Sequence, residues 1–208
     1  VGYGIQAPPS STLEMRASFL RHCPELENQN YILYLSRIHP KKGIDLLINA
    51  YITLKNQGVD LPILVIVGPG LETPYGEKMK ILAASSKDIK LVGMLTGSAK
   101  WGAFYGCDVF ILPSHQENFG IAIVEALACK KMVLITDQIN ICKEIQNADA
   151  GLVERDIQDG IIKLLEGWSD MTKEEKMKMS SNAFQLFQEQ FSVASSSKRL
   201  RDMLLSSK

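Results

Sequence analysis

The stretch from Asp108 to Ile135 reads DVFILPSHQENFGIAIVEALACKKMVLI and contains every part of a β–α–β unit. The apolar run at 109–112 predicts a buried strand, and a second apolar run at 132–135 predicts another. Between them, Gly120 opens a segment rich in helix formers at 121–128. The stretch therefore predicts two strands joined by a helix, which is the repeating unit of a parallel sheet.

The same alternation of strand and helix continues on both sides of this unit. It predicts an α/β fold with a doubly wound parallel sheet of about six strands and helices on both faces. The other strands are predicted at 31–35, 61–67, 89–92 and 150–153, and the helices at 11–21, 44–56, 75–84, 99–106, 141–147, 156–165, 172–191 and 192–207. By domain, we expect a hinge and lead-in helix at 1–28, a Rossmann-like domain at 29–191 and a carboxyl-terminal helix at 192–208.

Two sequences of the form Ser/Thr-x-x-Glu predict capping boxes at helix starts. They are Ser11 to Glu14, before the lead-in helix, and Thr172 to Glu175, before the helix at 172–191. In a capping box the hydroxyl accepts an N–H of the first turn, and the glutamate accepts the N–H of the capping residue.

Composition excludes several functional classes. The chain has 208 residues, with 23 basic and 23 acidic side chains, which gives no general argument for nucleic acid as a partner. No apolar run approaches the ~20 residues of a membrane-spanning helix. The four cysteines form no CxxC pair and the three histidines are far apart, so we expect free thiols in a reducing, cytoplasmic setting and no metal site. Because the chain starts with Val1, we expect it to be part of a longer protein.

Two glutamates stand at unusual places in the opening stretch. Glu125 lies in an otherwise apolar helix, where an unpartnered buried carboxylate would be costly. Glu117 precedes that helix, on a loop at the carboxyl end of a strand, which is where open α/β sheets bind ligands. A helical spacing would place the two about 12 Å apart, with the helix start at Gly120 as an anion site between them. Two interpretations stay open: acceptors for ligand hydroxyls, or a helix cap at Glu117 and a core salt bridge at Glu125.

A basic loop follows the strand at 31–35. Arg37 and Lys42 flank it, and Gly43 closes it at the start of a helix. A guanidinium and an ammonium near a helix start suit a diphosphate, although a solvated basic loop is the simpler alternative. The glycines of Gly68-Pro-Gly70 are typical of a turn, and the chain contains neither GxxxxGK[ST] nor GxGxxG.

Taken together, these residues resemble the carboxyl-terminal, donor-binding domain of family-4 retaining glycosyltransferases, which have the GT-B fold. The resemblance covers about Tyr31 to Val153. It is carried by SRIHPKKG at 36–43, VIVGPG at 65–70, CDVFILPS at 107–114 and a Glu-x7-Glu signature from Glu117 to Glu125. The chain departs from the family pattern at Ser36, Lys130 and Met132, where Gly, Gly and Pro are usual, and within 138–144 only Glu144 matches.

The resemblance implies a role for each matching residue. Arg37 and Lys42 would hold the donor diphosphate and stabilise the leaving group, and Glu117 would contact the transferred sugar; these three form the expected catalytic set. Glu125 would accept the ribose hydroxyls, and backbone near 92–95 would line a base pocket. Backbone N–H groups along the loop would contact the sugar and the phosphates, and these belong to Asn118, Phe119, Gly120 and Ile121.

The resemblance also implies what the chain works with. The substrate would be a nucleoside-diphosphate sugar, with no cofactor and no bound metal. The acceptor would bind an amino-terminal domain that this chain lacks, so we expect the chain alone to bind donor weakly and to catalyse little. Peripheral membrane contact is an option for the full-length protein. The alternatives are a non-catalytic nucleotide-sugar-binding module and a GT-B epimerase, which would need a different set of acidic and histidine residues.

Overall fold

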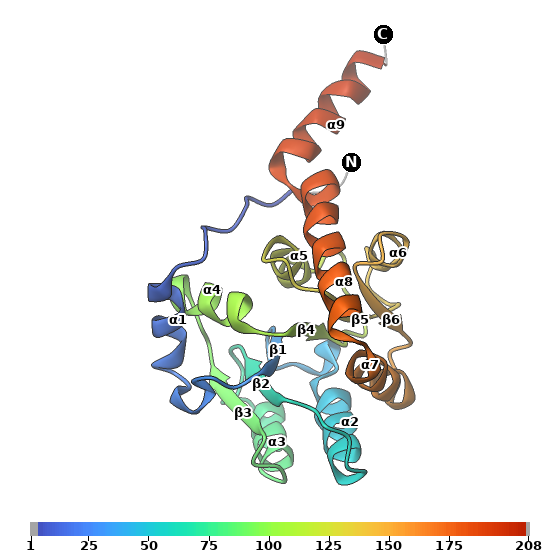
Figure 1. The fold of residues 1–208 in the computed structure, drawn as a ribbon. Coiled ribbons are helices and arrows are strands. Elements are labelled where there is room, and N and C mark those ends of the chain that lie inside the picture. The colour runs from blue at the N-terminus through green and yellow to red at the C-terminus, as the bar shows by residue number, and fades with distance from the viewer. Residues whose placement is uncertain (1–3, 207–208) are drawn as a thin grey trace.

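A six-stranded parallel sheet forms the centre of the molecule in the computed structural model, which describes residues 4–206 (Figure 1). The strand order is β3-β2-β1-β4-β5-β6, and every neighbouring pair is parallel. This confirms the predicted doubly wound sheet. The strands are β1 (Tyr31–Leu35), β2 (Ile63–Val67), β3 (Ile89–Gly93), β4 (Val109–Leu112), β5 (Val133–Thr136) and β6 (Gly151–Glu154).

Helices cover both faces of the sheet (Figure 1). On one face α2 packs against α3 and α7; on the other, α1 packs against α4, and α8 packs against α5 and α6. The helices are α1 (Leu13–Leu20), α2 (Ile44–Asn56), α3 (Pro74–Ala83), α4 (Gly97–Gly106), α5 (Ile121–Ala128), α6 (Cys142–Asn147), α7 (Gln158–Asp170), α8 (Lys173–Leu186) and α9 (Val193–Ser206). Short turns of other helix types are η1 (Pro24–Leu26), η2 (Pro40–Lys42) and η3 (Phe187–Phe191).

The inner strands are buried because helices cover them from both sides. All four residues of β4 and of β5 are buried, which explains why both read as unbroken apolar runs. The edge strands β3 and β6 are mostly half-buried. Large aromatic side chains fill the space between sheet and helices, and they include Tyr34, Tyr51, Phe104 and Phe110.

Several predicted boundaries are wrong by a few residues. The strand predicted from residue 61 begins at Ile63, since Pro62 has no N–H to donate to a neighbouring strand. The helix predicted at 156–165 runs from Gln158 to Asp170. The long helix predicted at 172–191 ends as an α-helix at Leu186 and continues as the π-helical turn η3.

The two predicted capping boxes have different outcomes. Thr172 caps α8 as predicted: its hydroxyl accepts the Glu175 N–H, and the Glu175 carboxylate accepts the Thr172 N–H. The box predicted from Ser11 is wrong, because Thr12 is the capping residue of α1 and accepts the Met15 N–H at 3.2 Å. Ser11 and Thr12 both carry a hydroxyl that can cap a helix, and the helix begins after Thr12.

The amino-terminal segment and α9 meet at one point. Ile5 donates to the Phe191 carbonyl at 2.8 Å and accepts from the Val193 N–H at 3.1 Å. From there α9 projects away from the body of the molecule (Figure 1). Within residues 4–206, no helix combines the length and the apolar character that crossing a membrane requires.

The strand order fixes where a ligand can enter. The chain runs outward from β1 to β2 and β3, then returns to β4 on the other side of β1 and continues to β5 and β6. In such sheets the loops after the two strands at the reversal diverge and leave a crevice at their carboxyl ends. Here these are the β1–α2 loop and the β4–α5 loop, which carry the basic and the acidic residues singled out in the sequence.

Candidate functional site

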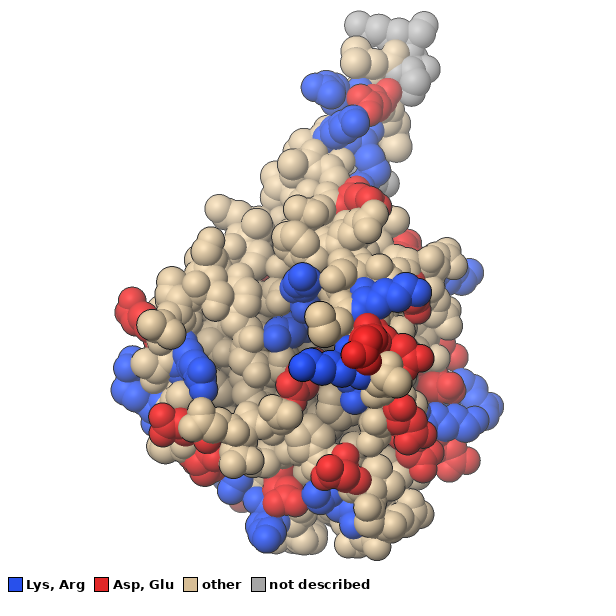
Figure 2. Space-filling model, viewed as in Figure 1, with Lys and Arg blue, Asp and Glu red and all other residues tan. Residues whose placement is uncertain are grey.

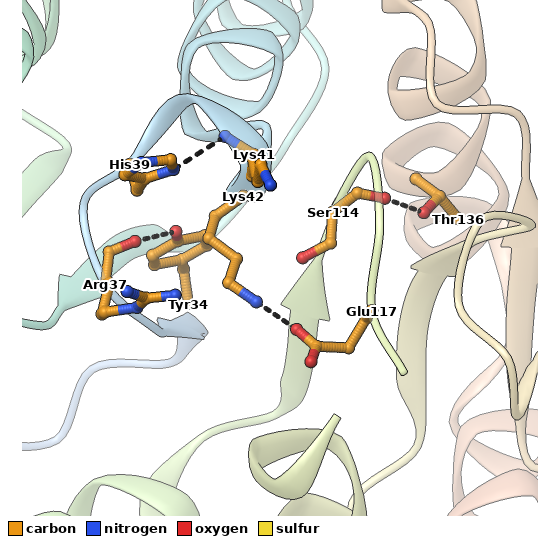
Figure 3. A network of polar contacts seen from close by, with 8 residues as sticks. All are labelled: Tyr34, Arg37, His39, Lys41, Lys42, Ser114, Glu117 and Thr136. Carbon is orange, nitrogen blue, oxygen red and sulfur yellow. Dashed lines mark hydrogen bonds and ion pairs between the residues drawn. The ribbon is translucent and has the colours of Figure 1, made fainter. Parts of the chain in front are cut away.

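A lysine and a glutamate from these two loops form an ion pair at the carboxyl ends of β1 and β4. Lys42 Nζ donates to a carboxylate oxygen of Glu117, and the two side chains are only 11% and 21% exposed (Figure 3). The pair joins residues 75 positions apart in the chain. The structure therefore brings together two of the three residues expected to be catalytic.

Backbone contacts hold the two loops together beside this pair. The His115 N–H donates to the Lys41 carbonyl at 3.0 Å. Gly43 adopts a left-handed conformation with φ +63°, and a Cβ built there would lie 2.0 Å from the Pro113 carbonyl oxygen. The loops thus approach more closely than any side chain at residue 43 would permit.

Arg37 lies on the same basic loop as Lys42 but is exposed. Its carbonyl accepts the Tyr34 hydroxyl at 3.0 Å, and in Figure 3 its guanidinium turns towards the side on which the Lys42 chain lies. In the part of the chain that the structure describes, the guanidinium has no hydrogen-bond or ion-pair partner. It therefore remains available to an anionic ligand.

The turn that contains Gly68 and Gly70 packs against the β1–α2 loop, which carries Arg37. Ser36 donates to the Val67 carbonyl at 3.0 Å and Ile38 to the Pro69 carbonyl at 2.8 Å. A Cβ on Gly68 would lie 1.7 Å from the Ser36 carbonyl oxygen. Beyond forming a turn, Gly68 thus allows the β2–α3 loop to support the loop that carries Arg37.

The segment from Glu117 to Gly120 is held by its backbone. The Glu117 N–H donates to Gln138 at 3.3 Å, and the Glu117 carbonyl accepts the Asn140 N–H at 3.0 Å. Gly120, with φ +71°, is the capping position of α5 and supplies no side-chain cap. The first N–H groups of a helix have no partner within the helix, so this end of α5 can receive an anion.

The other expected donor-binding residues of this segment differ in exposure. Asn118 is exposed and Ile121 is 61% exposed. The ring of Phe119 packs edge-on against Phe191, with ring centroids 5.9 Å apart. The side chain of Phe119 therefore serves packing against the carboxyl-terminal part of the chain.

The environment expected for Glu125 is wrong in one respect. The helix is not buried all round, since Ile121 is exposed and Glu125 is half-buried with 14% of its side chain accessible. Glu125 forms an ion pair with Lys100 of α4 at 2.7 Å, as the salt-bridge interpretation expected. The other half of that interpretation, a helix cap by Glu117, is wrong because Glu117 pairs with Lys42.

Two further contacts reach the site from residues that sequence reasoning missed. His115 Nδ1 lies 2.9 Å from a carboxylate oxygen of Asp156, which follows β6, and the contact ties the Glu117 loop to the β6–α7 connection. Lys100 pairs with Glu125 across 25 residues. His115 and Asp156 each follow a strand closely, and this position in the sequence could have marked them as candidates for the site. Lys100 lies within a helix, where its position in the sequence does not distinguish it from other surface lysines.

The departures from the family pattern are accommodated locally. Lys130 takes a left-handed conformation, φ +59°, which glycine adopts without strain. Met132 is fully buried in place of the usual proline. Glu144 is half-buried, with one carboxylate oxygen that lacks a hydrogen-bond partner among residues 4–206.

Other features of the surface lie away from this site. A groove of about 1180 Å³ runs along the opposite edge of the sheet, where the strands begin, and its lining includes Asn30, Asp60, Asp108 and Lys131. Among residues 4–206 there is no group of three or more His, Cys, Asp or Glu side chains that could hold a metal ion.

A Rossmann-like sheet with basic loops and a glycine-opened helix at its strand-order reversal defines one half of a GT-B fold. The chain belongs to the family of glycosyl transferases group 1, whose sequence profile matches residues 19–186. It is 25% identical over 130 residues to the capsular polysaccharide biosynthesis glycosyltransferase CapM of Staphylococcus aureus, which covers 62% of this chain and 34% of CapM.

Solved glycosyltransferases share the fold. One is a glycosyltransferase from Rickettsia africae, with a TM-score of 0.82 and 21% identity over 97% of this chain and 55% of that one. Another is HepE of Anabaena, solved in complex with UDP and glucose, with a TM-score of 0.79 and 19% identity over 98% of this chain and 55% of HepE. The chain thus spans about a third of its curated relative and about half of each solved chain.

Proposed function

We propose that this chain is the donor-binding domain of a retaining glycosyltransferase that uses a nucleoside-diphosphate sugar. The observation that carries the proposal is the Lys42–Glu117 pair at the carboxyl ends of β1 and β4, beside the start of α5, which has no side-chain cap. Family membership supports it, as does the structural neighbour HepE, which was solved in complex with UDP and glucose.

Each group in the site has a role in this proposal. Arg37 and Lys42 bind the diphosphate and stabilise the negative charge that develops on it as the sugar leaves. Glu117 accepts hydrogen bonds from sugar hydroxyls, while the N–H groups of 118–121 contact the sugar and the phosphates. Glu125 accepts the ribose hydroxyls. Two cations at the diphosphate supply the charge that a metal would otherwise provide, so donor binding should survive a chelator.

Donor entry must change the Lys42–Glu117 pair. The carboxylate holds the lysine in the free site, whereas a bound donor offers it a diphosphate and offers the carboxylate sugar hydroxyls. In the free site each of the two half-buried charges therefore compensates the other, and in the bound site the donor takes over this role.

The acceptor is proposed to bind outside these 208 residues, because the chain spans only about half of the solved glycosyltransferases. We expect the chain alone to bind a nucleotide-sugar and to transfer little sugar. Rapid transfer by the chain alone would contradict this part of the proposal.

Thermal unfolding with nucleoside diphosphates tests donor binding. We expect one of UDP, ADP or GDP to stabilise the chain by about 2.7 kcal/mol at a hundredfold excess over its dissociation constant, with or without EDTA. Arg37→Met and Lys42→Met should each lose most of this response. Lys80→Met is the matched control, since Lys80 forms an exposed ion pair with Glu77 on α3.

The proposal fails if no nucleotide stabilises the wild-type chain. It also fails if the Arg37 and Lys42 variants respond as strongly as the wild type and the Lys80 control.

A further inference from the structure

A second acid–base pair lies beyond the start of α5. Lys100 reaches from α4 to Glu125 on α5, and its Nζ lies 2.7 Å from Glu125 Oε1. The two side chains are 23% and 14% exposed. Lys100 Nζ also lies 4.2 Å from the centre of the Trp101 ring. Two contacts of different kinds therefore fix the end of an otherwise flexible side chain.

The pair is placed where a ligand can reach one side of it. Ile121, one turn before Glu125 on α5, is exposed, so this face of the helix is open. α4 begins directly beyond β3, at the same edge of the sheet as the crevice. The hydrogen bond from Lys100 goes to one carboxylate oxygen, Oε1, and the second oxygen, Oε2, can accept a hydrogen bond from a ligand.

We propose that Lys100 is a positioning residue that orients Glu125 for the two ribose hydroxyls of the donor. The inference rests on the proposed function and deepens it, since it assigns the sugar preference of the nucleotide to this pair. Lys100 compensates the half-buried carboxylate and fixes the direction of its free oxygen, so that a diol with two O–H donors fits. A 2′-deoxynucleotide lacks one donor and leaves part of the carboxylate unsatisfied.

The two pairs of the site differ in a way that makes this assignment testable. Lys42 is proposed to leave Glu117 for the diphosphate, so its loss weakens binding of every diphosphate. Lys100 is proposed to stay on Glu125 when the donor binds. Its loss should weaken the binding of nucleotides that carry a ribose and leave the binding of inorganic pyrophosphate unchanged.

Calorimetric titration of the 208-residue chain provides the test. The ligands are UDP, ADP and GDP, their 2′-deoxy counterparts and inorganic pyrophosphate. For the nucleotide that binds best, we expect Lys100→Met to lower the affinity about tenfold, to abolish the preference for ribose over deoxyribose, and to leave pyrophosphate affinity within twofold of the wild type. Lys100→Arg should restore the preference, and Lys80→Met should behave as the wild type.

A double-mutant cycle separates positioning from direct contact. If Lys100 acts through Glu125, Lys100→Met should cause no further loss in a Glu125→Gln background. Circular dichroism melts of each variant establish that it is folded. An unchanged ribose preference in folded Lys100→Met, no ribose preference in the wild type, or fully additive losses in the cycle would each overturn the inference. A wild-type chain that binds neither pyrophosphate nor any nucleotide would instead refute the proposed function.

Discussion

Gly43 is the residue on which the meeting of the two loops depends. It lies directly after Lys42, has φ +63°, and leaves room for the Pro113 carbonyl where a side chain would otherwise stand. Glycine is therefore required at residue 43 for two reasons: the left-handed backbone conformation and the lack of space for a side chain. Gly58 shares only the first requirement, with φ +85° and no atom within 4 Å of a built Cβ.

This difference gives a matched pair of substitutions. Gly58→Ala should lower the free energy of unfolding by about 1 kcal/mol, from backbone strain alone. Gly43→Ala should lower it by about 3 kcal/mol or more, because the chain must also move away from Pro113. Urea denaturation of both variants measures the difference. Equal losses would show that the close approach of the loops is not rigid.

The four cysteines differ in their access to solvent. Burial raises the pKa of Cys23 to about 11 and the pKa of both Cys107 and Cys129 to about 12, so these thiols resist ionisation. Cys142 is only half-buried. Because the thiolate is the reactive form, a cysteine needs both exposure and ionisation to react.

An aromatic disulfide reagent should therefore distinguish one thiol from three. At pH 8 the folded chain should react rapidly at Cys142 alone, and all four thiols should react in denaturant. Cys142→Ser should remove the rapid phase, monitored by absorbance of the released thiolate. A second rapid thiol in the folded wild type would contradict the buried positions of the other three.

At the scale of elements, the capping of α8 shows a local sequence signal that the structure uses fully. Thr172 and Glu175 exchange hydrogen bonds at the helix start. At α1 a single hydroxyl, that of Thr12, makes the cap. The cap of α8 thus satisfies one more backbone donor than the cap of α1.

Thr172→Ala should cost about 1 kcal/mol of the free energy of unfolding, since it removes the acceptor of the Glu175 N–H. Thr172→Ser keeps a hydroxyl at the same position and should retain most of the stability. Urea denaturation of the two variants checks this expectation. A serine variant as unstable as the alanine variant would mean that the threonine methyl, not the cap, stabilises α8.

For the whole molecule, charge is balanced in number and intermingled in space. The chain has 23 basic and 23 acidic side chains, and on the face shown in Figure 2 blue and red residues alternate over the body. An anionic ligand is therefore drawn to the crevice by its nearby cations and not by a net charge of the molecule.

The salt dependence of pyrophosphate binding should report these local cations. Affinity of the wild type should fall several-fold between about 0.1 and 1 M NaCl, as the Debye length shrinks from ~10 to ~3 Å. Lys42→Met should bind more weakly with a flatter salt dependence, whereas Lys80→Met should match the wild type. Calorimetry at several salt concentrations measures the slopes, and identical slopes for all three proteins would contradict a role for Lys42 in anion binding.

The sequence by itself determined the elements and their order. Apolar runs located all six strands, because burial on both faces of a parallel sheet requires continuous apolar segments. The predicted ends of some strands and helices were wrong, as at Pro62 and Ser11, because the chemistry of a single residue decides where the element begins. The residues expected in the site were also found at one edge of the sheet, since parallel strands end on the same side.

Tertiary structure alone decided which charges pair. Nothing local links Lys42 to Glu117, Lys100 to Glu125 or His115 to Asp156, which are 75, 25 and 41 residues apart. The Lys42–Glu117 pair depends on how closely its two loops approach, and that distance is set by positions such as Gly43 and Gly68, where a backbone atom of another loop occupies the space of a side chain. The spacing of apolar residues along the chain indicates which face of a helix or strand is buried. It does not indicate which residue will pair with a buried or half-buried charge, because that partner comes from a distant part of the chain.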